Sequence, residues 1–307
     1  MALFFCACRA ASLEPSLRWP AGGELVVAGE RVPVDAPVVL WTQEPFYDAY
    51  SEQPRFSANG PLGKRYRPGR EPKTSELAAR VEQDGWTRAL LAEQVDLFVI
   101  HYDACGTSRE CFRVLQDERT LSVHFLLDLD GTLYQTLDLA DQAWHARSAN
   151  PRAIGVEVAH VGAFAPEERA AFSRGYEWTE DGVRLALERP RAESLRRRDF
   201  HGAPARPAPI EGEIHGARFA QYDFTPEQYE SLAALTAALA RVFPKIALDA
   251  PRDAAGRVRT EALSDDEKAR FHGVLGHYHL QTDKRDPGPA FDWERLLDAA
   301  RARAVSP

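Results

Sequence analysis

Residues 276–293 read GHYHLQTDKRDPGPAFDW, and this stretch says more about the fold than any other part of the chain. It places His277, His279, Lys284 and Asp286 around an Asp-Pro-Gly-Pro turn. Proline restricts φ and glycine permits positive φ, so such a turn fixes the backbone that carries Asp286. By itself the stretch is compatible with a surface loop, and its meaning depends on the strands that accompany it.

Two apolar segments predict buried strands with polar side chains at functional positions. Residues 95–100 form a largely continuous apolar run that is followed by His101. Residues 154–158 alternate, so that the apolar side chains face one side and Glu157 faces the other. A histidine after a strand, a distant histidine and an aspartate are suitable ligands for Zn²⁺. Three protein ligands with one open position are the arrangement of a catalytic site.

Helical and strand patterns interleave along the rest of the chain. Thr225 before Pro226, with Gln228 three residues on, predicts an N-cap and capping box. Helices are predicted at residues 74–84, 86–95, 110–118 and 225–243, and strands at 95–101, 123–128, 132–136 and 154–160. The predicted fold class is α/β, with a mixed central sheet flanked by helices.

Asp130-Gly131 lies between two apolar runs, which predicts a β-hairpin. Turn chemistry therefore explains both Asp128 and Asp130, and we do not assign them as the carboxylate pair of a glycosidase.

Five segments resemble the type 2 N-acetylmuramoyl-L-alanine amidases, zinc enzymes that cut peptidoglycan and share their fold with peptidoglycan recognition proteins. They are LFVIHYDA around His101, SVHFLLDLDGTLYQ from Ser122, QAWHA around Trp144, AIGVE ending at Glu157, and GHYH…DKRDPGPAFDW. Each segment alone is a weak pattern, but their common order is strong evidence. The resemblance covers about residues 96–297 and implies the zinc-amidase fold with insertions.

The resemblance also implies roles for individual residues. It assigns Zn²⁺ to His101, His277 and Asp286, and it makes Glu157 the general base and acid. An acid on the open face of a strand is otherwise more often paired with a cation. Lys284 matches the family's lysine that faces the oxyanion of the tetrahedral intermediate, the alternative being a solvated loop lysine.

Three further residues are substrate-binding candidates. Trp144 and His145 are expected to line the cleft, or His145 to orient neighbouring groups, and a buried structural role is the alternative. Asn150 is expected to contact the muramyl-peptide stem.

The closing stretch departs from the close bacterial relatives in one respect. The interval from His277 to Asp286 is one residue shorter, and His279 stands where those relatives often have Asp. His279 is therefore a competing candidate for a metal ligand.

The predicted reaction is zinc-dependent hydrolysis of the amide between N-acetylmuramic acid and L-alanine, in intact wall or in anhydro-muropeptides. The alternative is a peptidoglycan-binding module without catalysis. A third interpretation is a toxin or phage-like lytic effector with the same chemistry.

The formal net charge of −8 argues against a nucleic-acid partner, which would require a basic face. The sequence has no run of 18 or more apolar residues, so no transmembrane helix is predicted.

Cys6 and Cys8 are compatible with a lipid anchor or with an unstructured leader. Relatives often carry a disulfide where Cys105 and Cys111 stand, the alternatives being free thiols or zinc ligands. Since disulfides form in oxidising compartments, we expect a cell-envelope location in the periplasm, with a lipid-anchored lipoprotein as one form of it.

The chain is expected to divide into an N-terminal extension at residues 1–75, partly irregular, and an amidase domain at 76–303. Within that domain, insertions are expected at about 166–222 and 250–268 because these segments are long and lack periodicity. The first insertion is interpreted either as a lid over the site or as a passive surface excursion.

Overall fold

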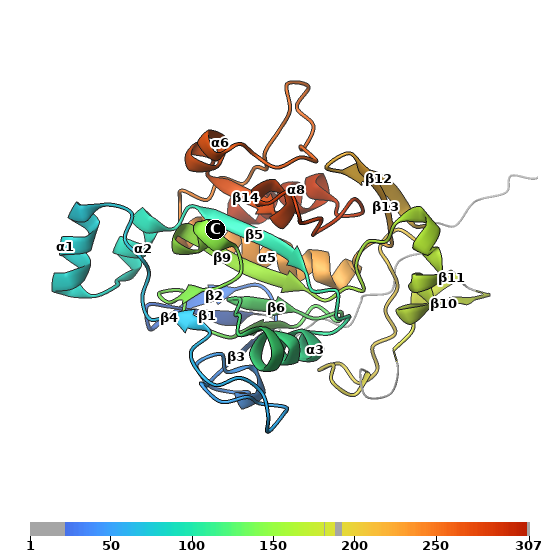
Figure 1. Cartoon of the computed structure of the whole chain (residues 1–307), viewed down its shortest axis with the longest axis horizontal. Helices are drawn as coiled ribbons and strands as arrows, with labels where there is room; N and C mark the ends of the chain where they lie inside the picture. Colours follow the sequence, from blue (N-terminus) through green and yellow to red (C-terminus); the bar gives the residue numbers. More distant parts are fainter. Residues whose placement is uncertain (1–21, 181, 188–191, 306–307) are drawn as a thin grey trace, which may run out of the picture.

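The computed structural model describes residues 22–180, 182–187 and 192–305 and has a six-stranded mixed sheet at its centre (Figure 1). The strand order is β14 (Gly273–Gly276), β5 (Leu97–Tyr102), β9 (Ala153–Val158), β6 (Phe125–Leu127), β7 (Leu133–Gln135) and β3 (Val38–Leu40). The strands from β14 to β6 run parallel, β7 is antiparallel to β6, and β3 is parallel to β7. The predicted α/β class with a mixed sheet is confirmed.

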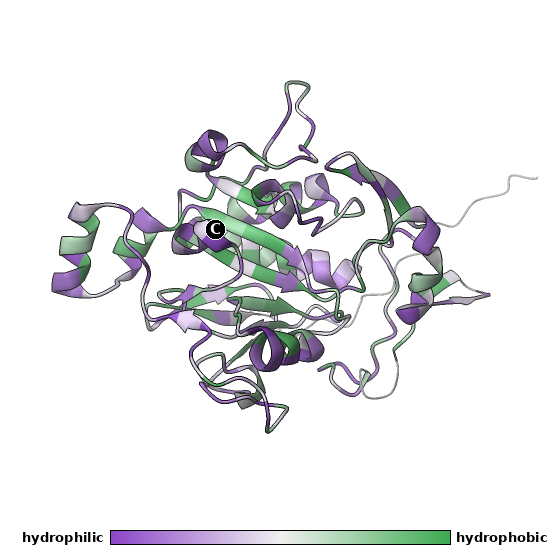
Figure 2. Cartoon of the chain, in the orientation of Figure 1, coloured by the Kyte–Doolittle hydropathy of each residue, from purple (hydrophilic) through white to green (hydrophobic). Residues whose placement is uncertain are grey.

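Helices cover both faces of this sheet. Phe98 and Ile100 of β5 pack in one cluster with residues of α5 (Pro226–Val242) and α8 (Trp293–Val305). Leu126 of β6 points to the opposite face and packs with Phe112 of α3 (Ser108–Arg113). The central strands are accordingly mostly hydrophobic, with hydrophilic residues at their carboxyl ends, as Figure 2 shows, because both of their faces are removed from water.

Side-chain caps begin the helices where the sequence predicts them. Thr74 accepts a hydrogen bond from the Leu77 backbone at the start of α1 (Ser75–Asp84). Thr225 and Gln228 form the predicted capping box of α5. The second predicted helix is α2 (Arg88–Gln94), and α3 continues as the short π-helix η2 (Val114–Arg119).

The predicted hairpin joins β6 and β7. Gly131 has a φ of +83°, and a Cβ there would lie 2.9 Å from the Glu227 carbonyl oxygen, so α5 packs against a position that requires glycine. Asp128 and Asp130 are buried and accept hydrogen bonds from backbone N–H groups, including that of Thr132. Their role is thus structural in this hairpin.

Residues 22–74 pack against the central sheet and add a strand to it. A hairpin of β1 (Gly23–Val27) and β2 (Glu30–Val34) packs Leu25 and Val27 into the main core. Gln135 of β7 hydrogen-bonds both backbone groups of Val26, at 2.8 Å each. The expected N-terminal extension thus contributes to the main core, and its strand β3 forms the edge of the central sheet.

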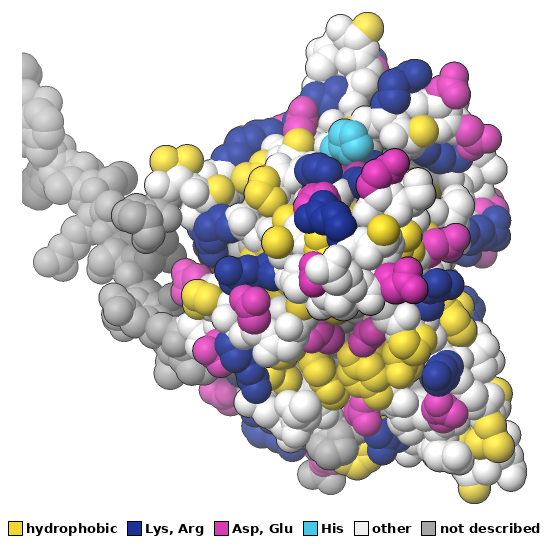
Figure 3. All heavy atoms as spheres, turned by 90° about the vertical axis from the view of Figure 1, so that its left-hand side faces the viewer, with side chains coloured by type: hydrophobic (Ala, Val, Ile, Leu, Met, Phe, Trp, Pro, Cys, Tyr) yellow, Lys and Arg dark blue, Asp and Glu magenta, His cyan; other side chains and the backbone are white. Residues whose placement is uncertain are grey.

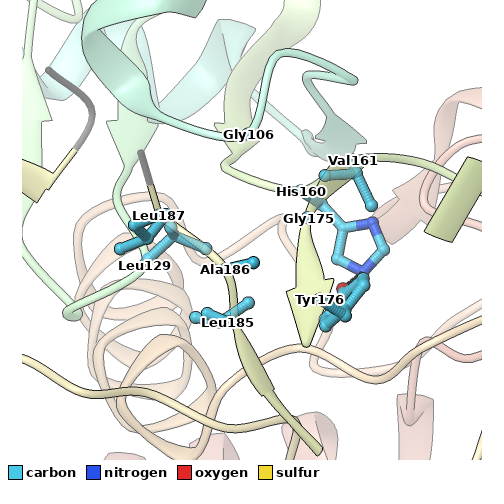
Figure 4. A pocket seen from close by; sticks show the side chains of 9 residues that line it. All are labelled: Gly106, Leu129, His160, Val161, Gly175, Tyr176, Leu185, Ala186 and Leu187. Carbon is cyan, nitrogen blue, oxygen red and sulfur yellow. Dashed lines mark hydrogen bonds between the residues drawn. The ribbon is translucent and has the colours of Figure 1, made fainter. Parts of the chain in front are cut away.

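The first insertion forms its own small layer beside the carboxyl ends of the strands (Figure 1). It contains η4 (Pro166–Arg174), β10 (Tyr176–Thr179), β11 (Gly182–Leu185), β12 (Ile210–Ile214) and β13 (Ala217–Gln221). Tyr176 and Tyr222 belong to its hydrophobic cluster. His160 Nε2 lies 3.0 Å from both the Tyr222 carbonyl oxygen and the Tyr176 hydroxyl, and Figure 4 shows the ring beside Tyr176. These contacts fix the insertion to the segment that follows β9.

The second insertion is short and polar. It contains an isolated bridge between Arg252 and Val258 and leads into α6 (Asp265–Arg270), which has a capping box at Ser264.

Charges of both signs are interspersed on the face that carries α1 (Figure 3), so this face has no single-sign field of the kind that binds nucleic acids. Among the helices described, none has the length and apolar content that crossing a bilayer requires. Cys6 and Cys8 lie outside the described residues.

Candidate active site

Three strand ends meet at one edge of the sheet and carry the polar residues singled out from the sequence. His101 is the penultimate residue of β5, Glu157 is the penultimate residue of β9, and His277 follows β14 directly. Because the three strands are parallel neighbours, their carboxyl ends meet at the same edge, which is where α/β proteins place their sites.

Three donor atoms form a compact triangle at this edge. His101 Nδ1, His277 Nδ1 and Asp286 Oδ2 lie 3.0 Å from one another in every pairing. Such a triangle leaves points about 2.0–2.1 Å from all three atoms, which is the usual bond length from Zn²⁺ to nitrogen or carboxylate oxygen. All three residues are buried. The donor set and its spacing therefore fit zinc, with one side of the triangle open for a further ligand.

The backbone around Gly276 explains why the aspartate reaches the histidines. A Cβ at Gly276 would lie 2.5 Å from Pro287 Cδ, so only glycine lets the loop pack against the strand end. The Tyr278 backbone donates to the Asp286 carbonyl oxygen at 3.1 Å. The loop from His277 to Asp286 thus turns back on itself and places the Asp286 carboxylate beside both histidines.

The electrostatics of the triangle favour the metal-binding forms. Burial, followed by the charge of His277, lowers the pKa of His101 to about 4, so its imidazole is neutral near pH 7. Burial acts to raise the pKa of Asp286, but the two neighbouring histidines outweigh it and hold that pKa below its ordinary range. A neutral imidazole and an ionised carboxylate are the forms that bind metal ions.

A second layer of side chains orients both histidines. His145 Nδ1 lies 3.0 Å from His101 Nε2, and a Cβ at Gly155 would collide with the His145 ring at 2.5 Å, so glycine makes room for it. Gln281 Nε2 lies 2.5 Å from His277 Nε2. Gln281 was not predicted as a site residue from the sequence. Its spacing of four residues from His277 on one helical turn was the available signal.

His279 does not reach the triangle. Its Nδ1 accepts a hydrogen bond from the Gly276 backbone at 2.9 Å, and its Nε2 lies 2.8 Å from the Arg259 carbonyl oxygen. Both ring nitrogens are therefore used inside the fold, and His279 is excluded as a competing ligand.

Glu157 lies beside the triangle on the open face of β9. Ile154, Val156 and Val158 belong to the core on the other face, as the alternation predicts. Burial, followed by the charges of Asp286 and Asp103, raises the pKa of Glu157 well above its ordinary value. A carboxyl group with a raised pKa can both take up and release a proton near neutral pH.

A cleft of about 820 Å³ lies over these groups. Trp144, His145, Asn150 and Lys284 all line it, so the structure brings the predicted substrate-binding and oxyanion residues to the same cleft. The Asn150 carboxamide oxygen accepts hydrogen bonds from the backbone of His145 at 3.1 Å and of Ala146. Asn150 thus supports the loop that carries His145.

Cys105 and Cys111 also line the cleft, but they are free thiols that share a hydrogen bond, so the expected disulfide is not present. Burial, followed by this hydrogen bond, raises the pKa of the Cys111 thiol. Thiolate, the form that reacts to give a disulfide, is therefore disfavoured at Cys111.

Comparison with known proteins agrees with this geometry. A family model described as N-acetylmuramoyl-L-alanine amidase matches residues 91–289, which is more than half of the chain. No curated protein matches the sequence.

Several solved structures are similar to the chain. AmpD is 20% identical, with 68% of this chain and 86% of that chain covered and a TM-score of 0.34. AmiD from E. coli, in complex with the substrate anhydro-N-acetylmuramic acid-L-Ala-D-gamma-Glu-L-Lys, is 17% identical, with 71% and 59% covered and a TM-score of 0.37. AmiA from Staphylococcus aureus is 12% identical, with 78% and 95% covered and a TM-score of 0.38. Because these TM-scores are low, the family assignment rests on the match to residues 91–289.

Proposed function

Because this chain belongs to the N-acetylmuramoyl-L-alanine amidase family and hydrolyses the amide between N-acetylmuramic acid and L-alanine, we propose that it acts with a zinc ion held by His101, His277 and Asp286. The observation that carries the proposal is the triangle of donor atoms at 3.0 Å spacing. When bound there, zinc would polarise the scissile carbonyl group and acidify a nearby water molecule.

Glu157 is the proposed general base and acid. It takes a proton from the water that attacks the lactyl carbonyl carbon, and it returns a proton to the nitrogen of the departing L-alanine. The C–N bond breaks, which leaves a lactyl carboxylate and a peptide with a free amino terminus. The raised pKa of Glu157 supports both transfers, since the side chain holds the proton between them.

Lys284 is the proposed partner of the oxyanion. It lines the cleft, and it is close enough to the triangle for its charge to contribute to the lowered pKa of His101. A cation next to the developing negative charge stabilises the transition state relative to the ground state.

Trp144 is proposed to line the substrate cleft, whereas His145 and Asn150 support the site through their contacts with His101 and with the backbone. Peptidoglycan lies in the cell envelope, and we propose the periplasm as the compartment of this enzyme.

Digestion of purified sacculi tests the proposal. Wild-type protein and Glu157→Ala are compared with and without a zinc chelator, and the soluble products are read by mass spectrometry. We expect peptides that begin with free L-alanine from the wild type, and their loss in the variant and after chelation. Release of the same peptides by fully metal-depleted protein would contradict the zinc assignment.

A further inference from the structure

A second pocket, of about 280 Å³, adjoins the catalytic cleft. Tyr102, Ala104, Cys105 and Arg285 line both cavities, so the two are neighbours at the metal-binding edge. Tyr102 follows His101 and Arg285 precedes Asp286, which puts the mouth of the pocket one residue from two of the proposed ligands.

The far wall of this pocket comes from the segment that leads into the first insertion and from Arg174 of the insertion itself. Residues 161–164 and Arg174, the last residue of η4, complete the lining. Phe164 is bridged to Ala220 of β13 by a pair of backbone hydrogen bonds of 2.9 and 2.8 Å. Val161 also lines the small cavity drawn in Figure 4. His160 lines the same cavity and holds the insertion through its contacts with Tyr176 and Tyr222. The wall is thus a packed part of the fold.

Two arginines give the pocket its chemical character. The guanidinium carbon of Arg285 lies 5.0 Å from the centre of the Phe219 ring, and its Nε donates to the Tyr102 hydroxyl at 3.1 Å. The guanidinium carbon of Arg174 lies 5.6 Å from the centre of the Phe164 ring. Stacking on an aromatic face orients a planar guanidinium and leaves its edge free to bind a carboxylate with two hydrogen bonds.

The charge of this pocket contrasts with the charge of the chain. Arg174 and Arg285 are the only charged side chains among the described residues that line it, whereas the whole sequence carries a net charge of −8. An anionic group is therefore the ligand that the pocket fits.

The peptide side of the substrate supplies an anionic group near the scissile bond. The carboxyl group of N-acetylmuramic acid is consumed in the scissile amide, so the muramyl side carries no free carboxylate. A glutamyl residue linked through its γ-carboxyl, as in the compound bound to AmiD, retains a free α-carboxylate. That carboxylate lies within about two residue lengths, roughly 7 Å, of the scissile nitrogen.

We infer that Arg174 and Arg285 form a subsite for the α-carboxylate of the γ-linked glutamyl residue, so that the first insertion selects peptide stems in which this group is free. The inference rests on the proposed function, since it assigns the peptide side of that substrate to one end of the cleft. The insertion is then a specificity element and not a passive excursion.

Two soluble substrates test the inference: anhydro-N-acetylmuramyl-L-Ala-D-γ-Glu-L-Lys and its derivative in which the glutamyl α-carboxylate is an amide. Dissociation constants for both are measured by calorimetry in a Glu157→Gln background, so that neither ligand is consumed. The same measurement is made after adding Arg174→Ala, Arg285→Ala, or both. Arg241→Ala, an exposed arginine of α5, is the matched control.

We expect the acid to bind at least about tenfold more tightly than the amide, as for a charged hydrogen-bonded pair. The double variant should reduce this ratio to near one, and Arg241→Ala should leave it unchanged. Equal binding of the two ligands, or a ratio that survives in the double variant, would overturn the inference. Product release by the otherwise wild-type enzyme is scored separately. Selective binding of the acid without cleavage would support the subsite and contradict the amidase mechanism. Cleavage without selectivity between the acid and the amide would support the amidase mechanism and contradict the subsite.

Discussion

His101 and Glu157 are register partners on the parallel strands β5 and β9. Both side chains point to the face opposite α5, where the cleft lies, because the flanking residues Ile100 and Val156 point into the core. Side chains alternate along a strand, so a slip of one residue would turn Glu157 into the apolar face. The hydrogen bonds of the sheet thus set the relation between the proposed metal ligand and the proposed base.

Glu157→Gln should therefore separate chemistry from metal binding. The amide keeps the size of the side chain but cannot take up the proton, so we expect kcat to fall about 10²- to 10⁴-fold. Zinc content and thermal stability should stay at the wild-type level, because Glu157 is not part of the donor triangle. Near-normal kcat in this variant would assign the proton transfers to another group.

Asp286→Asn should remove the anionic donor and lower zinc affinity at least about tenfold, measured by competition with a chromogenic chelator. Asp283→Asn is the matched control in the same loop, since Asp283 is exposed and pairs with Arg147. If both variants retained zinc equally, the ligand set would have to be assigned differently.

The sequence predicted the elements of the site better than the contacts between them. The set of His101, His277 and Asp286 was predicted because the three residues match motifs of a known family, while strand ends and a Pro-Gly loop gave local support. The apolar run at residues 37–41 indicated a strand, but the place of β3 at the edge of the central sheet was not predicted, because its pairing with β7 joins segments almost a hundred residues apart and each strand is only three residues long. The use of both His279 ring nitrogens depends on Arg259, whose position no local pattern reveals.

Gln281→Leu should weaken zinc binding through His277 without removing a ligand. An imidazole that binds metal through Nδ1 carries its proton on Nε2, and the Gln281 amide is the group beside that atom. Turning the amide so that its oxygen faces Nε2 would satisfy this proton. Loss of such a partner typically lowers metal affinity 10- to 100-fold. Gln83→Leu, on the exposed face of α1, is the control. A Gln281→Leu protein with unchanged zinc affinity would show that the contact does not orient the ring.

Acid should destabilise the folded chain through His160, outside the donor triangle. Burial lowers the pKa of His160 to about 4, although its hydrogen bond to the Tyr222 carbonyl acts in the opposite direction. In the unfolded chain the pKa returns to about 6.5. Between these two values the unfolded state binds a proton that the folded state does not, so the free energy of unfolding falls as the pH falls from about 6.5 to 4. A shift of this size corresponds to on the order of 3 kcal/mol.

The measurement is urea unfolding at several pH values between 7.5 and 4 for the wild type, His160→Gln and His201→Gln. Glutamine at position 160 can still donate to the Tyr222 carbonyl and does not titrate, so this variant should lose less stability on acidification than the wild type. His201 is exposed, so its variant should follow the wild-type curve. Other buried histidines, such as His124, contribute equally to all three proteins and cancel in the comparison. Identical pH dependence in the wild type and His160→Gln would show that His160 does not couple protonation to the packing of the insertion.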